Sequence, residues 1–154
     1  MQKSGNEVVY IFAGLGLALA NGIIGFVDDY TKVVKKRNLG LTAIQKLVLQ
    51  FLAAGIYLAV LGILGYGTAT VIPFVGTVDL GFFYYIIAAV VIVGVVNAVN
   101  LTDGIDGLCS SVTAVIAIFF SLVFLREGNG AATFSLALAG GLVGFFLYNK
   151  NPAR

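Results

Sequence analysis

Two pairs of aspartates are the residues most suited to chemistry, and each pair borders a long apolar stretch. Asp28 and Asp29 form one pair, and Asp103 and Asp106 form the other. Crowded carboxylates repel each other, so each tends to become neutral unless a cation lies between them. A hard divalent ion such as Mg²⁺ suits them, because it takes oxygen ligands and is often completed by water and substrate phosphates. If the apolar stretches pack together, all four carboxylates can converge on one cleft.

Lysines follow the first aspartate pair. Lys32 stands four residues after Asp28 and shares its face if a helix continues, and Lys35 and Lys36 extend that side. Aspartates beside several cations can hold a metal ion and the anions bridged to it, which phosphoryl transfer requires. Simpler explanations are a solvated helix cap at the aspartates and a basic patch that binds anionic lipid. The spacing alone leaves these interpretations open.

The second pair lies in the most unusual stretch of the chain, residues 97–107. Asn97, Asn100, Asp103 and Asp106 recur at every third position, so the four sweep around one half of a helix end. Amides are costly near a bilayer unless they face a bundle interior or a wet cavity, so this stripe is expected to line a site. The two glycines of the stretch permit a bend or the close approach of a ligand. A polar turn between two helices is the alternative.

The apolar composition of the chain indicates that membrane-spanning helices position these residues. Of 154 residues, 60% are hydrophobic and 10% are charged, with a mean hydropathy of +1.03; soluble domains carry about 25% charge. This excludes a water-soluble single domain, a disordered tail and a nucleic-acid-binding module. Five stretches without Lys, Arg, Asp or Glu can each cross a bilayer as a helix. They are residues 8–27, 47–65, 82–99, 107–125 and 131–148. We expect an all-α, polytopic integral membrane protein with residues 1–154 as a single membrane domain.

The distribution of basic residues indicates the orientation in the membrane. Loops 28–46 and 100–106 and the tail 149–154 share one side and carry seven Lys and Arg residues, against two on the other side. The positive-inside rule makes the first side cytoplasmic, and both aspartate pairs lie there. On the opposite side, residues 68–78 alternate β-branched and small residues, which permits a short periplasmic β-hairpin.

Other kinds of chemistry are restricted. The chain has no histidine, so it can supply neither an imidazole base nor a histidine metal ligand. A single cysteine, Cys109, excludes an intramolecular disulfide and is expected to be a small core residue. Gly140 and Gly144 have the spacing that lets helix backbones approach closely.

Three sequence blocks resemble one enzyme family. They read Gly-Phe-Val-Asp-Asp-Tyr-x-Lys at 25–32, Asn-Leu-Gly-Leu-Thr-Ala-x-x-Lys-Leu-x-x-Gln at 38–50, and Asn-Ala-Val-Asn-Leu-Thr-Asp-Gly-Ile-Asp-Gly-Leu at 97–108. In wording and order they resemble the polyprenyl-phosphate N-acetylhexosamine-phosphate transferases, more closely the phospho-N-acetylmuramoyl-pentapeptide branch than the N-acetylglucosamine-phosphate branch. The resemblance implies an Mg²⁺-dependent enzyme of peptidoglycan synthesis in the bacterial inner membrane. It would move phospho-N-acetylmuramoyl-pentapeptide from its UDP carrier to undecaprenyl phosphate, giving lipid I and UMP.

The resemblance also implies roles for individual residues. Asp28, Asp29 and Asp103 match carboxylates that assist the lipid phosphate or hold the metal ion. The implied substrate-binding residues are Lys32, Lys46, Asn97, Asn100, Gly104, Ile105 and Asp106. The implied partners are UDP-N-acetylmuramoyl-pentapeptide, undecaprenyl phosphate and the lipid bilayer, with a homodimer for the full-length protein and no nucleic acid.

The match is incomplete in length, because family members have about twice as many membrane helices. The resemblance therefore implies an internal fragment that lacks N-terminal helices, a later metal-binding aspartate and a histidine-rich loop, and that is inactive alone. Two other classes stay open. A channel would use the carboxylates as a cation path, although such a path would place charge within the apolar segments. A noncatalytic membrane module would bind only a partner subunit or lipid.

Overall fold

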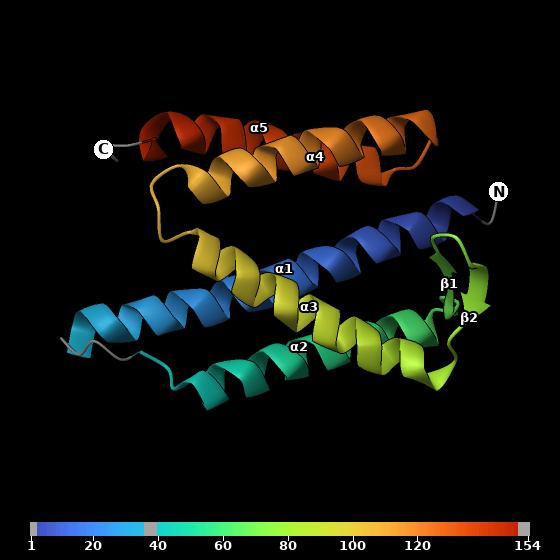
Figure 1. Ribbon diagram of the computed structural model, residues 1–154, viewed down its shortest axis with the longest axis horizontal. Helices are drawn as coiled ribbons and strands as arrows, with labels where there is room; N and C mark the ends of the chain where they lie inside the picture. Colours follow the sequence, from blue (N-terminus) through green and yellow to red (C-terminus); the bar gives the residue numbers. More distant parts are fainter. Residues whose placement is uncertain (1–2, 36–39, 151–154) are drawn as a thin grey trace. The chain divides into compact units, whose positions relative to one another are not determined.

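The computed structural model describes residues 3–35 and 40–150, which form five helices and one β-hairpin (Figure 1). The helices are α1 (Lys3–Lys35), α2 (Ala43–Ile63), α3 (Phe82–Thr102), α4 (Leu108–Arg126) and α5 (Ala131–Asn149), and the strands are β1 (Ala69–Ile72) and β2 (Gly76–Asp79). Each helix contains a stretch of 19 to 27 residues that is long and apolar enough to cross a membrane. The prediction of an all-α, multi-pass membrane protein with a short hairpin is confirmed. Some residues used above to predict the membrane orientation and the family resemblance lie outside the described residues. They are Lys36, Arg37, Asn38, Leu39 and Arg154.

Helix α1 extends beyond the apolar stretch that predicted it. The stretch ends at Val27, but the helix continues to Lys35, since neither glycine nor proline interrupts it there. The Thr31 hydroxyl donates to the carbonyl oxygens of Val27 and Asp28, both at 2.8 Å. Asp28 and Asp29 therefore lie on the helix and not after its end.

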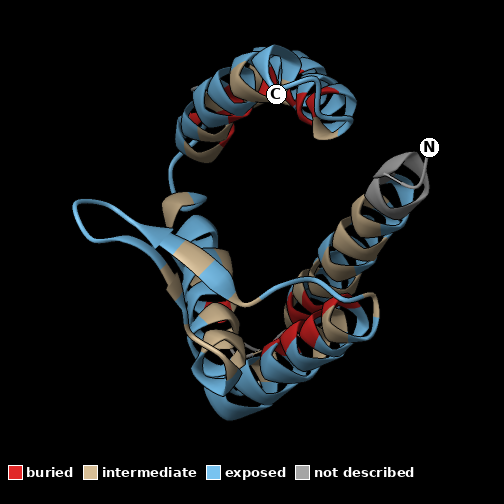
Figure 2. Ribbon diagram, turned by 90° about the vertical axis from the view of Figure 1, so that its right-hand side faces the viewer, coloured by how far each residue is buried: buried red, intermediate tan, exposed pale blue. Residues whose placement is uncertain are grey.

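The chain divides into two compact units, one of residues 12–96 and one of residues 1–11 with 97–154. In the first unit, buried side chains at Ala54, Leu58 and Leu61 follow helical spacing along one face of α2, and Ile24 of α1 and Val93 of α3 are also buried. Figure 2 marks buried positions in red along the ribbon. Most other apolar side chains are exposed, as expected for helices whose solvent is lipid. The single membrane domain stays a prediction.

In the second unit, α4 and α5 pack through small side chains. The buried residues are Ser110, Ala114, Ala117 and Ser121 on α4 and Ala132, Ser135 and Ala139 on α5. The Ser121 hydroxyl donates to the Ala117 carbonyl at 2.6 Å, so its burial leaves no donor unsatisfied. Gly140 and Gly144 are exposed, and a Cβ at either would meet no atom within 4 Å. Within this unit, alanine and serine provide the close helix approach, and a helix contact at these two glycines stays a prediction.

The hairpin connects α2 to α3. Its antiparallel register pairs Ala69 with Asp79 and Ile72 with Gly76. The Asp79 carboxylate closes its base, because Oδ1 accepts hydrogen bonds from the Thr68 hydroxyl and, at 3.0 Å, from the Gly81 amide. At the tip, Phe74 has a φ of 68°, a left-handed conformation that is rare for an aromatic residue.

Candidate functional site

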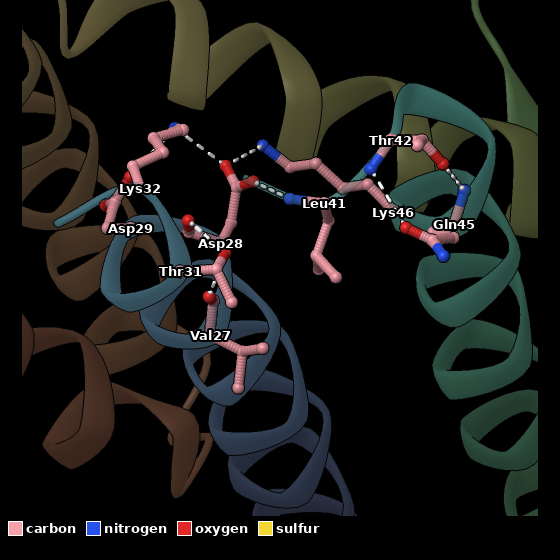
Figure 3. Close-up of polar contacts among 9 residues, drawn as sticks. All are labelled: Val27, Asp28, Asp29, Thr31, Lys32, Leu41, Thr42, Gln45 and Lys46. Carbon is pink, nitrogen blue, oxygen red and sulfur yellow. Dashed lines mark hydrogen bonds and ion pairs between the residues drawn. The ribbon is translucent and has the colours of Figure 1, made fainter. Parts of the chain in front are cut away.

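The C-terminal part of α1 carries the first cluster of charged residues. Because the helix continues through it, Lys32 lies one turn beyond Asp28, as the spacing predicted. The Lys32 Nζ donates to Asp28 Oδ2 at 2.9 Å and to Asp29 Oδ1 at 3.0 Å. Figure 3 shows the lysine reaching back along its own helix. One ammonium group is thus shared by the two neighbouring carboxylates.

The start of α2 supplies the other partners of Asp28. The Leu41 backbone N–H donates to Asp28 Oδ1 at 2.8 Å, and the Lys46 Nζ lies 3.7 Å from Asp28 Oδ2. A capping box positions this segment: the Thr42 hydroxyl accepts from the Gln45 amide, while the Gln45 side chain accepts from the Thr42 amide. We call Asp28, Lys32, Leu41 and Lys46 the Asp28 junction, since they join α1 to the start of α2 (Figure 3).

Gly40 allows the two segments to approach this closely. A Cβ at residue 40 would overlap the Asp28 carbonyl oxygen and the Asp28 Oδ1. Any other L residue would therefore push the Leu41 amide away from the carboxylate. Sequence reasoning assigned no role to Gly40 or to the Leu41 amide. The available signal was a glycine two residues before a Thr-x-x-Gln capping pattern.

The charged groups of this cluster differ in exposure. The side chain of Asp28 is 10% exposed and that of Lys46 is 16% exposed. The side chain of Lys32 is 41% exposed and that of Asp29 is 76% exposed. Ion pairs shielded in this way are screened less by salt than pairs on the open surface. The ammonium groups of Lys32, near the end of α1, and Lys46, at the start of α2, can bind phosphate oxygens, and the exposed Asp29 carboxylate can bind a cation.

The second predicted cluster lies in the other unit and is only partly helical. Asn97 and Asn100 are on α3, and Asp103 continues it for one bond, its N–H donating to the Val99 carbonyl at 3.1 Å. Gly104, Ile105 and Asp106 form an exposed turn between α3 and α4. The expectation of four polar groups sweeping around a helix end therefore fails at its last member.

Gly107, which closes this turn, has a packing role. It has a φ of 77°, and a Cβ there would lie 3.1 Å from a Phe146 ring carbon and 3.4 Å from the Lys150 Cα. The turn is thus held against the C-terminal end of α5. Cys109 is half-buried and is not among the buried core residues that its apolar surroundings predicted, and its Sγ lies 4.0 Å from the Thr113 hydroxyl oxygen.

The structure brings some of the predicted site residues together. Asp28, Asp29, Lys32 and Lys46 form one cluster in the unit of residues 12–96. Asn97, Asn100, Asp103, Gly104, Ile105 and Asp106 lie in the other unit. Convergence of all four carboxylates on one cleft stays a prediction. Among the described residues, neither unit by itself groups three acidic or cysteine side chains as metal ligands, so an ion there would need further oxygen ligands from water or phosphates.

Comparison with known proteins supports the resemblance seen in the three blocks. The chain is 47% identical over 138 residues to a phospho-N-acetylmuramoyl-pentapeptide-transferase of Clostridium botulinum (strain Eklund 17B / Type B), covering 88% of this chain and 42% of that protein. It is 45% identical over 147 residues to one of Caldanaerobacter subterraneus, covering 94% of this chain and 46% of the relative. A Listeria monocytogenes relative of the same name is 44% identical over 135 residues, which cover 86% of this chain and 42% of the relative.

The chain thus spans less than half the length of these relatives. The sequence model of glycosyl transferase family 4 matches residues 11–154. This range includes both aspartate pairs and all five predicted membrane stretches except the first few residues of the first. The chain belongs to glycosyl transferase family 4.

Proposed function

We propose that this chain is part of an enzyme that transfers phospho-N-acetylmuramoyl-pentapeptide from UDP to undecaprenyl phosphate, giving lipid I and UMP. The names of its relatives support the reaction, and the Asp28 junction is the observation that carries it. Among the described residues, the Asp28 junction places Lys32 of α1 and Lys46 of α2 around the Asp28 carboxylate. The exposed Asp29 carboxylate lies beside it. This combination suits phosphate groups and their counter-ion.

The reaction needs phosphates brought together and negative charge offset. An oxygen of the lipid phosphate attacks the phosphorus bonded to the sugar, and the bond from that phosphorus to the oxygen of UMP breaks. UMP leaves with the electron pair of that bond. Lys32 and Lys46 bind phosphate oxygens and offset the charge that grows on them. Asn97, Asn100, Gly104, Ile105 and Asp106 are proposed to contact the nucleotide sugar.

Magnesium is the proposed cofactor, and exposed carboxylates of this chain have the chemistry to hold it. Asp29 and Asp103 are both exposed and offer the oxygen ligands that Mg²⁺ prefers. Asp28 is also a predicted ligand, although two lysines already surround it. A bound Mg²⁺ ion would neutralise charge on the diphosphate and orient it.

The proposed location is the bacterial inner membrane, with the loops that carry the aspartates in the cytoplasm and the hairpin in the periplasm. The excess of Lys and Arg on the aspartate side supports this orientation. The nucleotide sugar would then reach the site from the cytoplasm, while undecaprenyl phosphate would reach it from the inner leaflet. A homodimer of the full-length protein is part of the same proposal.

A chimera tests the proposed function. This chain replaces the matching 138 residues of the Clostridium botulinum relative, and UMP release is measured with UDP-N-acetylmuramoyl-pentapeptide, undecaprenyl phosphate and Mg²⁺. We expect turnover in the chimera, a loss of about 10²- to 10³-fold in its Asp103→Asn variant, and none from the 154-residue chain alone.

Other outcomes discriminate between the alternatives. A folded but inactive chimera would favour the noncatalytic membrane module, provided that the parent enzyme is active in the same assay. Turnover with UDP-N-acetylglucosamine in place of the muramoyl substrate would favour the other branch of the family. UMP release by the 154-residue chain would contradict the proposal that it is inactive alone.

A further inference from the structure

The two neighbouring aspartates of α1 have different surroundings, although the sequence treats them as one motif. We propose that Asp28 is a positioning residue that holds Lys32 and Lys46 in place, and that Asp29 is the carboxylate of the pair that binds the divalent cation. This inference rests on the proposed function and divides its first aspartate pair into two tasks.

The carboxylate of Asp28 is already occupied by donors from three directions. Oδ1 accepts the Leu41 N–H at 2.8 Å, while Oδ2 lies 2.9 Å from the Lys32 Nζ and 3.7 Å from the Lys46 Nζ. In Figure 3 the two lysines reach it from different sides. A divalent cation at Asp28 would face both ammonium groups at close range and would displace at least one of them. The side chain is also 10% exposed, which leaves little room for the waters that Mg²⁺ retains.

Asp29 has the opposite surroundings. Its side chain is 76% exposed, and among the described residues its ion-pair partner is the shared Lys32 Nζ, 3.0 Å from Oδ1. A cation that binds Asp29 can keep most of its water shell and share it with substrate phosphates. Lys32 connects the positioning residue Asp28 to the proposed cation ligand Asp29, because it pairs with both carboxylates.

The role of Asp28 follows from what its loss would do. With no carboxylate between them, the Lys32 and Lys46 ammonium groups would repel each other and move apart. Asparagine at position 28 is a sharp probe, because its amide oxygen can still accept the Leu41 N–H while its NH₂ group faces two donors. Asp28→Asn thus removes the ion pairs and retains the shape. Asp29→Asn is the matched control, since it leaves every contact of Asp28 intact.

Two measurements separate the tasks. In the active chimera, Asp28→Asn is expected to raise the KM for the nucleotide sugar about tenfold or more, as loss of a charged hydrogen bond does, with an unchanged Mg²⁺ concentration for half-maximal rate. Asp29→Asn is expected to raise that Mg²⁺ concentration and to leave KM at saturating Mg²⁺ nearly unchanged.

Binding of Mn²⁺ to the 154-residue chain in detergent, followed by its electron paramagnetic resonance signal, provides a readout without turnover. We expect Asp29→Asn to weaken Mn²⁺ binding and Asp28→Asn to leave it unchanged. The inference would be overturned if Asp28→Asn weakened Mn²⁺ binding as much as Asp29→Asn does, or more. If the proposed function were wrong, the unsubstituted chimera would be inactive. The Mn²⁺ measurement would still show which of the two variants binds the cation more weakly.

Discussion

Two aspartates each tie together a pair of elements in the unit of residues 12–96, but with different partners. Asp28 joins α1 to the start of α2 and is paired with two lysines and one backbone amide. Asp79 closes the base of the hairpin and is paired with the Thr68 hydroxyl and the Gly81 amide. Neutral partners suffice to shape a turn. The Asp28 junction also contains two lysine ammonium groups, which can bind phosphate oxygens in addition to joining the two helices.

The two aspartates also differ in shielding. The Asp28 side chain is 10% exposed, whereas Asp79 is an exposed residue. Removing partners from a shielded charge leaves groups that water reaches poorly, while water readily replaces the partners of an exposed charge. We therefore expect changes at the Asp28 junction to have larger effects than changes at the hairpin.

The largest effect is expected from Gly40→Ala. The new Cβ would overlap the Asp28 carbonyl oxygen and Oδ1, so the backbone of one segment must move. Overpacking of this kind costs about 1–3 kcal/mol, and we expect a value near the upper end because backbone atoms cannot yield as a flexible side chain does. The free energy of unfolding in detergent micelles measures the cost.

A matched glycine in α2 provides the control for this substitution. A Cβ at Gly55 would meet no atom within 4 Å, so Gly55→Ala should leave stability unchanged or raise it by up to about 1 kcal/mol through helix propensity. Equal losses in Gly40→Ala and Gly55→Ala would show that the close approach of residue 40 to Asp28 is unimportant for stability.

Sequence reasoning reached the local part of the Asp28 junction and missed the rest. The Asp28–Lys32 pair follows from helical spacing, and it is confirmed. The contacts of Asp28 with Leu41 and Lys46 join separate elements, and no periodicity encodes the path of the chain between them. Helix α1 also ran on past Val27, because hydropathy marks where apolar residues end and not where helical hydrogen bonding ends.

The same distinction holds for the rest of the molecule. Five helices and the hairpin were predictable, since apolar length and β-branched alternation are local signals. The position of Asp106 was not, because the helical period stops where α3 ends at Thr102 and the turn follows its own geometry. The packing of α4 on α5 through serine and alanine was missed for another reason: small residues on several faces of a helix carry no mark of which face is buried.

An intermediate effect is expected from Thr42→Ala, which tests the support of the Asp28 junction from the side of α2. The substitution removes the hydroxyl that accepts the Gln45 amide and so opens the capping box. Loss of such a cap costs about 1 kcal/mol. Thermal unfolding in detergent should show a smaller loss than in Gly40→Ala, and Thr42→Ser should restore most of it. A loss in Thr42→Ser equal to that in Thr42→Ala would show that the hydroxyl is not the stabilising group.

The smallest effect is expected at the hairpin, where it appears as a dependence on pH. The Thr68 hydroxyl and the Gly81 amide donate to the Asp79 carboxylate and hold its pKa below the ordinary value of 3.8. Because the ionised form is favoured in the folded hairpin, its contribution is complete above pH 3.8 and is lost as the pH falls through the lower, folded pKa. Hydrogen exchange at the Gly81 amide should therefore accelerate, relative to its intrinsic rate, as the pH falls through the folded pKa of Asp79. The isosteric Asp79→Asn variant should lack this dependence, because its side chain does not titrate, and an unchanged profile in that variant would assign the effect to another group.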